Sequence, residues 1–447
     1  MVERVEGLGG LRAAVSLLRR NRDFRNLYVA SLISLGGDWF LIVALFGLAL
    51  DLTSSALSVA ALIAAQELPF FLVSPVGGAL TDRLDRRLLM IACDAVRAVL
   101  CLGFLLVRDA STMWAAYLLL AAISSFSAAF QPATMAAFPN LVEPRDLGPA
   151  NALFGSAWGT MLAVGAALGG IVTAALGRDA AFLIDAGTFL ASGLLIAGIR
   201  RPMSERRADH PETNVVRATA ETIRYARRDR RVLSLLGVKA GFGLAAGVLV
   251  LIAVLARQEF EAGDVGIGIL MSARGVGALI GPFLGRWLAG PDDRRLFGAI
   301  GMALGVFGIG YALVGVMPAL WLAAAAIAFA HLGGGAQWTL SSYGLQRVVP
   351  DRIRGRIFAF DAALITLTLT ASSLVTAWTA QTFGARPTTT ILGLVAVAWA
   401  VTWAWLTTGV RREATLNPGP PWSATAEGAP VPYVSEPDSG GEGEGVP

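Results

Sequence analysis

Twelve apolar runs, each long enough to cross a bilayer as a helix, follow one another along the chain. A helix rises about 1.5 Å per residue, so roughly 20 apolar residues span a hydrocarbon core about 30 Å thick. The runs are continuous and rich in Ala, Leu and Gly, which favours helices over the short alternating strands of a membrane barrel. They occupy residues 27–50, 56–80, 88–107, 112–136, 150–173, 179–199, 232–256, 264–288, 296–316, 319–343, 358–383 and 388–408. The sequence therefore predicts an all-α polytopic membrane protein.

The composition excludes the commoner soluble classes. Only 15% of the residues are charged, against about a quarter in a typical soluble domain. Cys93 and Cys101 lie in one apolar run and cannot build a disulfide framework. Two cysteines and two histidines leave little for a metal site, so neither a metal nor a cofactor is expected. The arginines are dispersed between apolar blocks, and the net charge of +4 therefore predicts no nucleic-acid partner.

The distribution of positive charge predicts the orientation. With the N-terminus inside, 29 of the 36 Lys and Arg residues fall in cytoplasmic segments, and only Arg108, Arg178, Arg257 and Arg386 fall in the opposite loops. Because Lys and Arg are retained on the cytoplasmic side, both termini are expected there, in the cell inner membrane. Residues 1–26 lack the apolar core of a signal peptide and favour an amphipathic surface helix around Leu11–Leu18.

The chain also divides into two similar halves. The longest polar interruption, residues 200–231, carries ten arginines and separates six apolar runs from six more. The stretch 84–89 recurs as 292–297 at an offset of 208, and 141–152 recurs as 348–359 at an offset of 207. Such a repeat predicts two homologous bundles with a cavity between them, as in alternating-access carriers.

These features define five predicted regions. They are a cytoplasmic N-terminal segment (1–26), an N-terminal six-helix bundle (27–199), a cytoplasmic linker (200–231), a C-terminal six-helix bundle (232–408) and an acidic, Pro/Gly-rich tail expected to be disordered (409–447).

Several motifs point to one family. The segment Gly78-Ala79-Leu80-Thr81-Asp82-Arg83-Leu84-Asp85-Arg86-Arg87 resembles the loop signature between helices 2 and 3 of the major facilitator superfamily. The residue pattern most resembles that of its enterobactin-exporter-like branch. The shared elements are Ser34-Leu35-Gly36-Gly37-Asp38, an Asp and an Arg in helix 3 (here Asp94 and Arg97), Phe130-Gln131-Pro132-Ala133 and Arg354-Gly355-Arg356. The resemblance covers about residues 24–408. It implies a twelve-helix secondary carrier with a small-molecule substrate.

The signature loop also has a physical interpretation. A glycine at 78 permits close helix approach, and the carboxylate of Asp82 suits a helix N-terminus. The arginines can pair with acids or lipid phosphates, or can simply follow the inside-positive bias. The resemblance implies that the loop latches helix 2 to helix 11 in the outward-facing state. The expected gating residues are Gly78, Asp82, Arg83, Arg86, Arg87 and, near helix 11, Asp361.

Charged side chains at bilayer depth are the candidate coupling residues, because each costs at least ~2.5 kcal/mol on insertion scales. They are Asp38, Glu67, Asp94, Arg97 and Arg274. Asp94 and Arg97 are three apart and can neutralise each other, so a structural pair is the alternative for them. Asp38 and Glu67 have no cation three or four residues away in their own helices. We expect one of them to carry a coupling proton, with Arg274 as a counter-charge or an anion contact.

Three other polar residues are expected to be structural. His331 is expected to pack with a satisfied ring, Lys239 to extend to the cytoplasmic surface, and Asp185 to cap or support its helix. In the fifth run, Gly165, Gly169 and Gly170 form a small-residue face for close packing.

The direction of transport is less constrained. Exporters of the superfamily carry Gly-Pro-x-x-Gly-Gly in helix 5, where Ala166 here replaces the proline, and the fourth run contains no arginine. No phosphate-binding Gly-rich loop and no catalytic constellation occur, so an ATP-driven pump and an enzyme are not expected. The prediction is a monomeric, lipid-embedded, proton-coupled exporter of a small amphipathic molecule. The alternatives are a proton-coupled importer of the same fold and a non-transporting membrane sensor.

Overall fold

The computed structural model describes residues 12–203, 223–290, 293–349 and 351–410, with the side chains of Asp82, Asp293, Asp351 and Arg352 left out. Within those ranges, twelve helical segments are long and apolar enough to cross a membrane, which confirms the predicted fold class. Most of the predicted tail, part of the linker and the first residues of the N-terminal segment lie outside the described residues.

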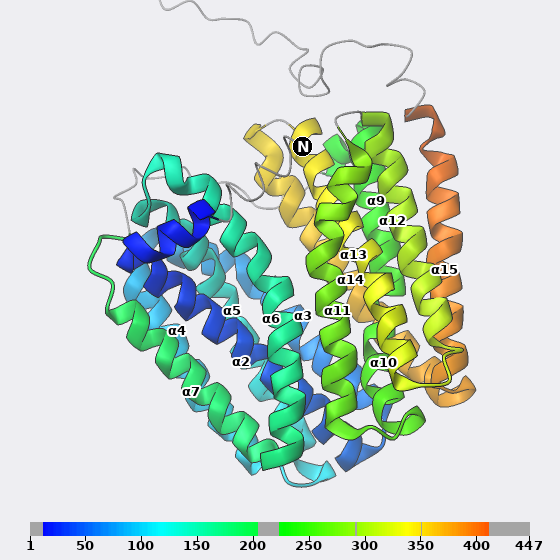
Figure 1. The fold of residues 1–447 in the computed structure, drawn as a ribbon, viewed down its shortest axis with the longest axis horizontal. Helices are drawn as coiled ribbons and strands as arrows, with labels where there is room; N and C mark the ends of the chain where they lie inside the picture. The colour runs from blue at the N-terminus through cyan, green and yellow to red at the C-terminus, as the bar shows by residue number, and fades with distance from the viewer. Residues whose placement is uncertain (1–11, 204–222, 291–292, 350, 411–447) are drawn as a thin grey trace, which may run out of the picture.

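Two bundles make up the molecule (Figure 1). The first, the N-half, contains α2 (Arg22–Thr53), α3 (Ala56–Arg83), α4 (Arg86–Leu102), α5 (Met113–Leu141), α6 (Leu147–Leu176) and α7 (Arg178–Ala197). The second, the C-half, contains α9 (Arg230–Ala245), α10 (Val248–Val254), α11 (Gly263–Ala289), α12 (Asp293–Val314), α13 (Leu320–Val348), α14 (Asp351–Phe383) and α15 (Ala385–Leu406). The end at which α2 begins is the N-terminal end of the molecule, and the opposite end is the far end. In Figure 1 the two bundles lie closest at the far end and diverge toward the N-terminal end.

Local signals set the helix boundaries. The Asn21 side chain accepts a 3.0 Å bond from the Phe24 amide and caps α2. Tight turns at the far end join α6 to α7 and α14 to α15. They depend on Gly177 and Gly384, whose φ values of +82° and +89° favour glycine. The two glycines are separated by the same offset as the sequence repeat. The internal repeat is therefore visible in the backbone.

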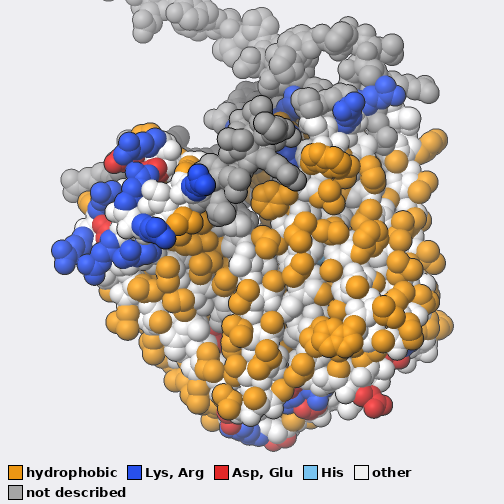
Figure 2. All heavy atoms as spheres, viewed as in Figure 1, with side chains coloured by type: hydrophobic (Ala, Val, Ile, Leu, Met, Phe, Trp, Pro, Cys, Tyr) orange, Lys and Arg blue, Asp and Glu red, His pale blue; other side chains and the backbone are white. Residues whose placement is uncertain are grey.

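On the face shown in Figure 2, the surface is apolar between two charged ends. Large exposed side chains include Leu106, Leu194, Phe283, Trp287 and Trp405. A soluble monomer rarely exposes so continuous an apolar surface. In a bilayer, the same side chains lie against lipid tails.

The seventh span is broken, whereas the sequence predicts one continuous run. It consists of α9, a turn at Ala246–Gly247, α10 and a π-helical segment (Leu255–Glu259). The Ser372 hydroxyl of α14 accepts a 3.1 Å bond from the Gly247 amide and donates to the Leu244 carbonyl. A Cβ at position 247 would lie only 2.2 Å from the Thr376 hydroxyl. The break thus has its polar backbone groups satisfied by α14, as membrane depth requires.

Two helix pairs form the seam between the halves, α6 with α11 and α3 with α14. A Cβ on Gly275 of α11 would lie 2.4 Å from the Ala163 amide nitrogen of α6, so the two backbones nearly touch. The Ser272 hydroxyl donates a 2.7 Å bond to the Ala163 carbonyl across the same contact. Close contact between small residues is the usual basis of helix association in membranes.

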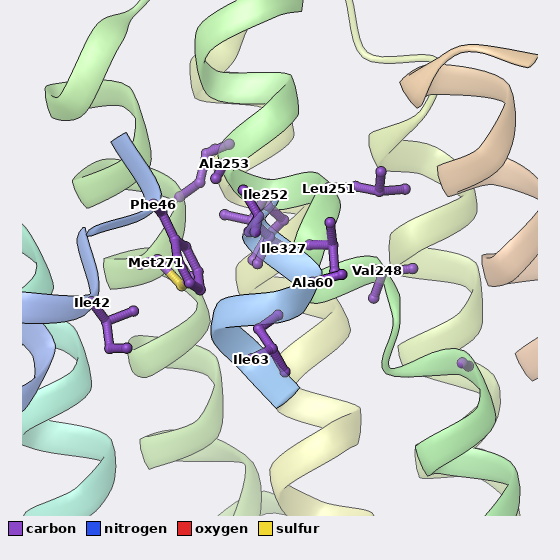
Figure 3. Packing of buried hydrophobic residues seen from close by; sticks show 14 of the residues in the cluster. Ile42, Phe46, Ala60, Ile63, Val248, Leu251, Ile252, Ala253, Met271 and Ile327 are labelled. Atoms are coloured by element: carbon purple, nitrogen blue, oxygen red, sulfur yellow. The ribbon is translucent and has the colours of Figure 1, made fainter. Parts of the chain in front are cut away.

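An apolar layer fills the seam toward the far end (Figure 3). Ile42 and Phe46 of α2 and Ile63 of α3 are buried here. Ile252 of α10 and Met271 of α11 belong to the same cluster from the C-half. The layer excludes water between the two halves at this level.

Candidate functional site

A buried ion pair lies inside the N-half, on α4. Asp94 and Arg97 pair with each other, and both side chains are buried. Arg97 also donates to the Ser127 hydroxyl of α5 at 3.2 Å. Its guanidinium carbon is 4.4 Å from the ring centres of both Phe130 and Phe189. Arg97 is therefore held by charge, a hydrogen bond and two aromatic faces.

Asp38 of α2 lies within electrostatic reach of this pair. Its side chain is partly exposed and, among the residues that the structure describes, it makes no hydrogen bond or ion pair. Asp38 is thus a mid-span acid whose carboxylate has no fixed partner.

Asp185 of α7 joins the same cluster, and its predicted capping role is wrong because it lies well inside the helix. Its carboxylate is fully buried and accepts from the Cys101 thiol at 3.3 Å and from the Thr188 hydroxyl at 3.1 Å. A Cβ at Gly37 would lie 2.1 Å from Asp185, so this glycine admits the acid next to Asp38. The sequence contains a signal that Asp185 belongs with Asp38. Like Asp38, Asp185 has no cation three or four residues away.

A second group of side chains meets across the seam at mid-height. Arg274 of α11 interacts electrostatically with Glu67 of α3, in the opposite half. Its guanidinium carbon lies 5.7 Å from the Trp39 ring centre and 5.5 Å from that of Trp158, both in the N-half. In the part of the chain described, no ion pair or hydrogen bond joins Glu67 to Arg274. The two charges belong to different halves and lie within electrostatic reach of each other.

His331 of α13 lies in the C-half close to Arg274. Its Nε2 is hydrogen-bonded to the Tyr311 hydroxyl of α12 at 2.9 Å, and both side chains are buried. The ring is therefore a satisfied packing residue in this conformation. No group of His, Cys, Asp and Glu within the described ranges has the arrangement of a metal site.

Lys239 and Asp361 form a buried ion pair between α9 and α14. Lys239 also donates to the Ser342 hydroxyl at 2.9 Å and lies 5.1 Å from the centre of the Trp338 ring. The prediction that Lys239 extends to the surface is therefore wrong, since its side chain is 1% exposed. Asp361, the expected gate partner, is engaged inside the C-half in this conformation.

The signature loop stabilises the N-terminal end of the N-half. Asp85 caps α4 by accepting a 3.0 Å bond from the Leu88 amide. Arg86 is buried and donates to the carbonyls of Ala136, at 2.8 Å, and Met203, at 2.9 Å. Arg87 donates to the Ala197 carbonyl, whereas Arg83 is exposed in the last turn of α3.

The close approach expected at Gly78 is made by its neighbour in this conformation. A Cβ at Gly78 would meet nothing, whereas one at Gly77 would lie 2.4 Å from the Ala128 carbonyl of α5. The side chain of Asp82 lies outside the described residues. A latch between this loop and helix 11 therefore stays a prediction.

The glycines of α6 face two different partners. A Cβ on Gly165 would lie 2.8 Å from the Gly36 carbonyl of α2, and one on Gly169 would lie 2.9 Å from Phe40 Cα. Gly170 instead faces Gly268 of α11, with a Cβ distance of 3.0 Å to its Cα. The small-residue stretch thus brings α6 close to its own half and to the other half.

A ring of four charges joins the halves at the far end. Arg257 of the C-half pairs with Asp51 of the N-half, and Arg178 of the N-half pairs with Asp264 of the C-half at 3.3 Å. Within the halves, Arg178 pairs with Asp51 at 2.5 Å and Arg257 with Asp264 at 2.7 Å. Arg257 also donates to the Gly47 carbonyl of α2 at 3.3 Å. Together with the apolar layer, this ring closes the far end.

The chain matches one family over almost its whole length. The family model MFS_3, described as "Transmembrane secretion effector", matches residues 14–425. A curated relative, "Uncharacterized MFS-type transporter YfiS" of Bacillus subtilis (strain 168), is 29% identical over 215 residues, which is 47% of this chain and 51% of that protein. The chain thus matches about half the length of YfiS. A second relative, "Putative bacilysin exporter BacE" of Bacillus subtilis, is 24% identical over 314 residues, which is 70% of this chain and 78% of that protein.

Solved structures share the fold at low sequence identity. A bacterial homologue of the human lysosomal transporter Spinster, crystallised in an inward-facing conformation, gives a TM-score of 0.65 at 14% identity, covering 89% of this chain and 97% of that one. The nucleoside transporter NupG gives a TM-score of 0.63 at 11% identity, covering 86% of this chain and 99% of that one. These likenesses concern the fold alone. The family match rests on the sequence itself, and the chain belongs to the transmembrane secretion effectors (MFS_3), which are transporters of the major facilitator type.

Proposed function

We propose that this transporter exports a small amphipathic molecule across the cell inner membrane in exchange for protons, by rocking of its two halves. A relative named as an exporter supports the direction. The narrower resemblance to the enterobactin-exporter-like branch stays a prediction. The orientation rests on the positive-inside distribution of arginines, which puts the N-terminal end of the molecule in the cytoplasm.

One observation carries the proton coupling. Asp38 and Glu67 lie at mid-span, are partly exposed, and have no bonded partner in the described ranges. An ionised carboxylate at bilayer depth is costly, so binding or releasing a proton changes the free energy of the conformation that holds it there. Each acid also lies near a cation that offsets part of this cost, Arg97 for Asp38 and Arg274 for Glu67.

The conformation described here corresponds to the loading state of the proposed cycle. Its far end is closed by the charged ring and the apolar layer, while the bundles diverge toward the N-terminal end (Figure 1). In the cycle, a substrate enters from the cytoplasm and displaces a proton, and the far end then opens. External protons return the carrier to the loading state.

The proposal can be tested without knowing the substrate. Spin labels at Ala110→Cys and Ala319→Cys lie on exposed positions at the far ends of the N-half and the C-half, and the two native cysteines are buried. Electron–electron double resonance between the two labels, in lipid nanodiscs, should show a population with a longer distance. The size of that population should differ between acidic and alkaline buffer. Asp38→Asn and Glu67→Gln should remove part or all of that change.

A matched control is Glu143→Gln, which removes an exposed carboxylate at the N-terminal end and should keep the full response. Comparing the drug and siderophore susceptibility of a deletion strain with that of an overexpressing strain tests the direction. A distance distribution indifferent to pH, or an undiminished response in both neutralised variants, would refute proton coupling. Greater sensitivity on overexpression would favour import.

A further inference from the structure

The mid-height group at the seam has two donors that lack acceptors. The Nε of Arg274 and the indole Nε1 of Trp39 are both buried, and neither has a hydrogen-bond partner among the described residues. They come from opposite halves, and the Arg274 guanidinium carbon lies 5.7 Å from the Trp39 ring centre. A buried donor without an acceptor is costly, and a charged one more so. An acceptor supplied by a ligand would satisfy both.

Aromatic surfaces border the same place. The rings of Trp39 and Trp158 meet edge to face, with their centres 5.9 Å apart. Trp158 is 45% exposed, so the pair still presents a free apolar surface. Aromatic side chains next to a few fixed polar groups are the usual composition of a small-molecule site. The apolar body of a ligand can lie against this surface while its charged groups reach Arg274.

Glu67 restricts the charge of that ligand. It interacts with Arg274 electrostatically but forms no bond with it in the described structure. An anion alone would satisfy Arg274 but bring no cation to replace the proton on Glu67, and a cation alone would leave the donors of Arg274 and Trp39 unsatisfied. A ligand with both charges matches both residues. Tyr311 also lies within electrostatic reach of Arg274, but its hydroxyl is hydrogen-bonded to His331.

We infer that the transported molecule is a zwitterionic amphipath. Its carboxylate accepts hydrogen bonds from Arg274 and Trp39, its ammonium group binds ionised Glu67, and its apolar or aromatic body lies against Trp39 and Trp158. This inference rests on the proposed function and names the substrate class of the same site. The charges balance, because the arriving ammonium replaces one proton on the Glu67 carboxyl group. That proton leaves toward the open end of the molecule.

The experiment uses matched probes and the full-length protein in nanodiscs. Each triad contains an aromatic zwitterion, its N-acetyl derivative, which is an anion, and its amide, which is a cation. Phenylalanine, naphthylalanine and phenylalanyl-phenylalanine provide three sizes. Calorimetric titration should show that, in at least one triad, the zwitterion binds about tenfold or more tightly than both derivatives, because each derivative loses one charged hydrogen bond.

The variants assign the two charges separately. Arg274→Gln should remove the advantage of the zwitterion over its amide, and Glu67→Gln should remove its advantage over the N-acetyl derivative. Glu143→Gln is the control and should change neither ratio. Proton release on binding, followed with a pH-sensitive dye, should occur in the unmodified protein and be lost in Glu67→Gln.

The inference is overturned if no triad shows a preference for the zwitterion, or if the preference survives both variants. A preference for the amide would indicate a cation site, and a preference for the N-acetyl derivative an anion site. These outcomes are separable from the failure of proton coupling. The pH response of the spin-labelled protein needs no ligand and would remain if only the substrate class were wrong.

Discussion

Neutralising Asp51 should open the far end, because the residue takes part in a contact that holds the two halves together. Two ion pairs of the ring cross the seam, Arg257 with Asp51 and Arg178 with Asp264. Asp51→Asn removes the first. It also leaves two arginines from opposite halves sharing one acid, and their mutual repulsion adds to the loss.

The magnitude follows from the exposure of the ring. The Asp51 side chain is 39% exposed and that of Arg257 is 21% exposed, so solvent screens the pair. Exposed ion pairs contribute about 0.2–1 kcal/mol each. The Asp51–Arg257 pair should lie near the upper limit, because the other two residues of the ring, Asp264 and Arg178, are more buried than Asp51. A loss of about 1 kcal/mol corresponds to roughly fivefold more of the far-end-open state. Asp51→Asn combined with Asp264→Asn should exceed the sum of the two, because no acid then separates the arginines.

The assay is the distance distribution between spin labels at Ala110→Cys and Ala319→Cys. The matched control is Glu259→Gln, which removes a 2.7 Å ion pair with Arg386 at the same end of the molecule but within the C-half. Glu259→Gln should leave the distribution unchanged, and added salt should reduce the difference between it and Asp51→Asn. If Asp51→Asn populates no more of the long distance than Glu259→Gln does, the ring does not hold the halves together.

Three further predictions concern stability, measured as the midpoint of thermal unfolding in detergent. Gly275→Ala should destabilise the protein by about 1–3 kcal/mol, because its Cβ would collide with the α6 backbone. Gly305→Ala, with open space around it, should be neutral or stabilising. Equal effects of the two variants would contradict this reasoning. Lys239→Met should cost about 3–5 kcal/mol because it strands a buried carboxylate, and adding Asp361→Leu should restore most of the loss; additive losses would refute the pairing. Asp85→Ala should cost about 1 kcal/mol and Asp85→Asn little, unless the capping bond to Leu88 contributes nothing.

Much of the fold could be predicted because a bilayer imposes simple rules on a sequence. The twelve spans follow from length and apolarity, and the pairing of Asp94 with Arg97 follows from helical spacing. The break in the seventh span could not be predicted in this way. It depends on the Ser372 hydroxyl of another helix, which reaches the backbone at Gly247.

Contacts between helices are harder to predict from the sequence than contacts within one helix. From the sequence, Arg178 and Arg257 are interpreted as ordinary loop charges. Counting the positive residues of a loop does not show which acids they pair with. The partners of Asp185 could not be predicted, because they lie on other helices, α2 and α4. Contacts between helices depend on which faces meet, and apolar runs without a strong polar side do not reveal those faces.

Under the proposed function, the distribution of charge between the halves indicates where proton coupling would lie. At the far end each half neutralises itself, since Asp51 pairs with Arg178 and Asp264 pairs with Arg257. Separating the halves there exposes two neutral pairs to water and costs little. In the interior the charges are divided unequally. Among the mid-span residues that the structure describes, the N-half contains the acids Asp38, Glu67, Asp94 and Asp185 with one cation, Arg97, and the C-half contains Arg274 and the self-neutralised pair of Lys239 and Asp361.

In the proposed cycle, moving the halves apart at mid-height takes Glu67 and Arg274 out of each other's field, and no cation in the described part of the N-half replaces Arg274 beside Glu67. In that cycle, protonation or a ligand compensates one or both charges before the seam rearranges. The far-end ring needs no such compensation. Mutations in the ring should accordingly alter the position of the conformational equilibrium and leave its pH dependence intact, whereas mutations at Glu67 should alter the pH dependence itself.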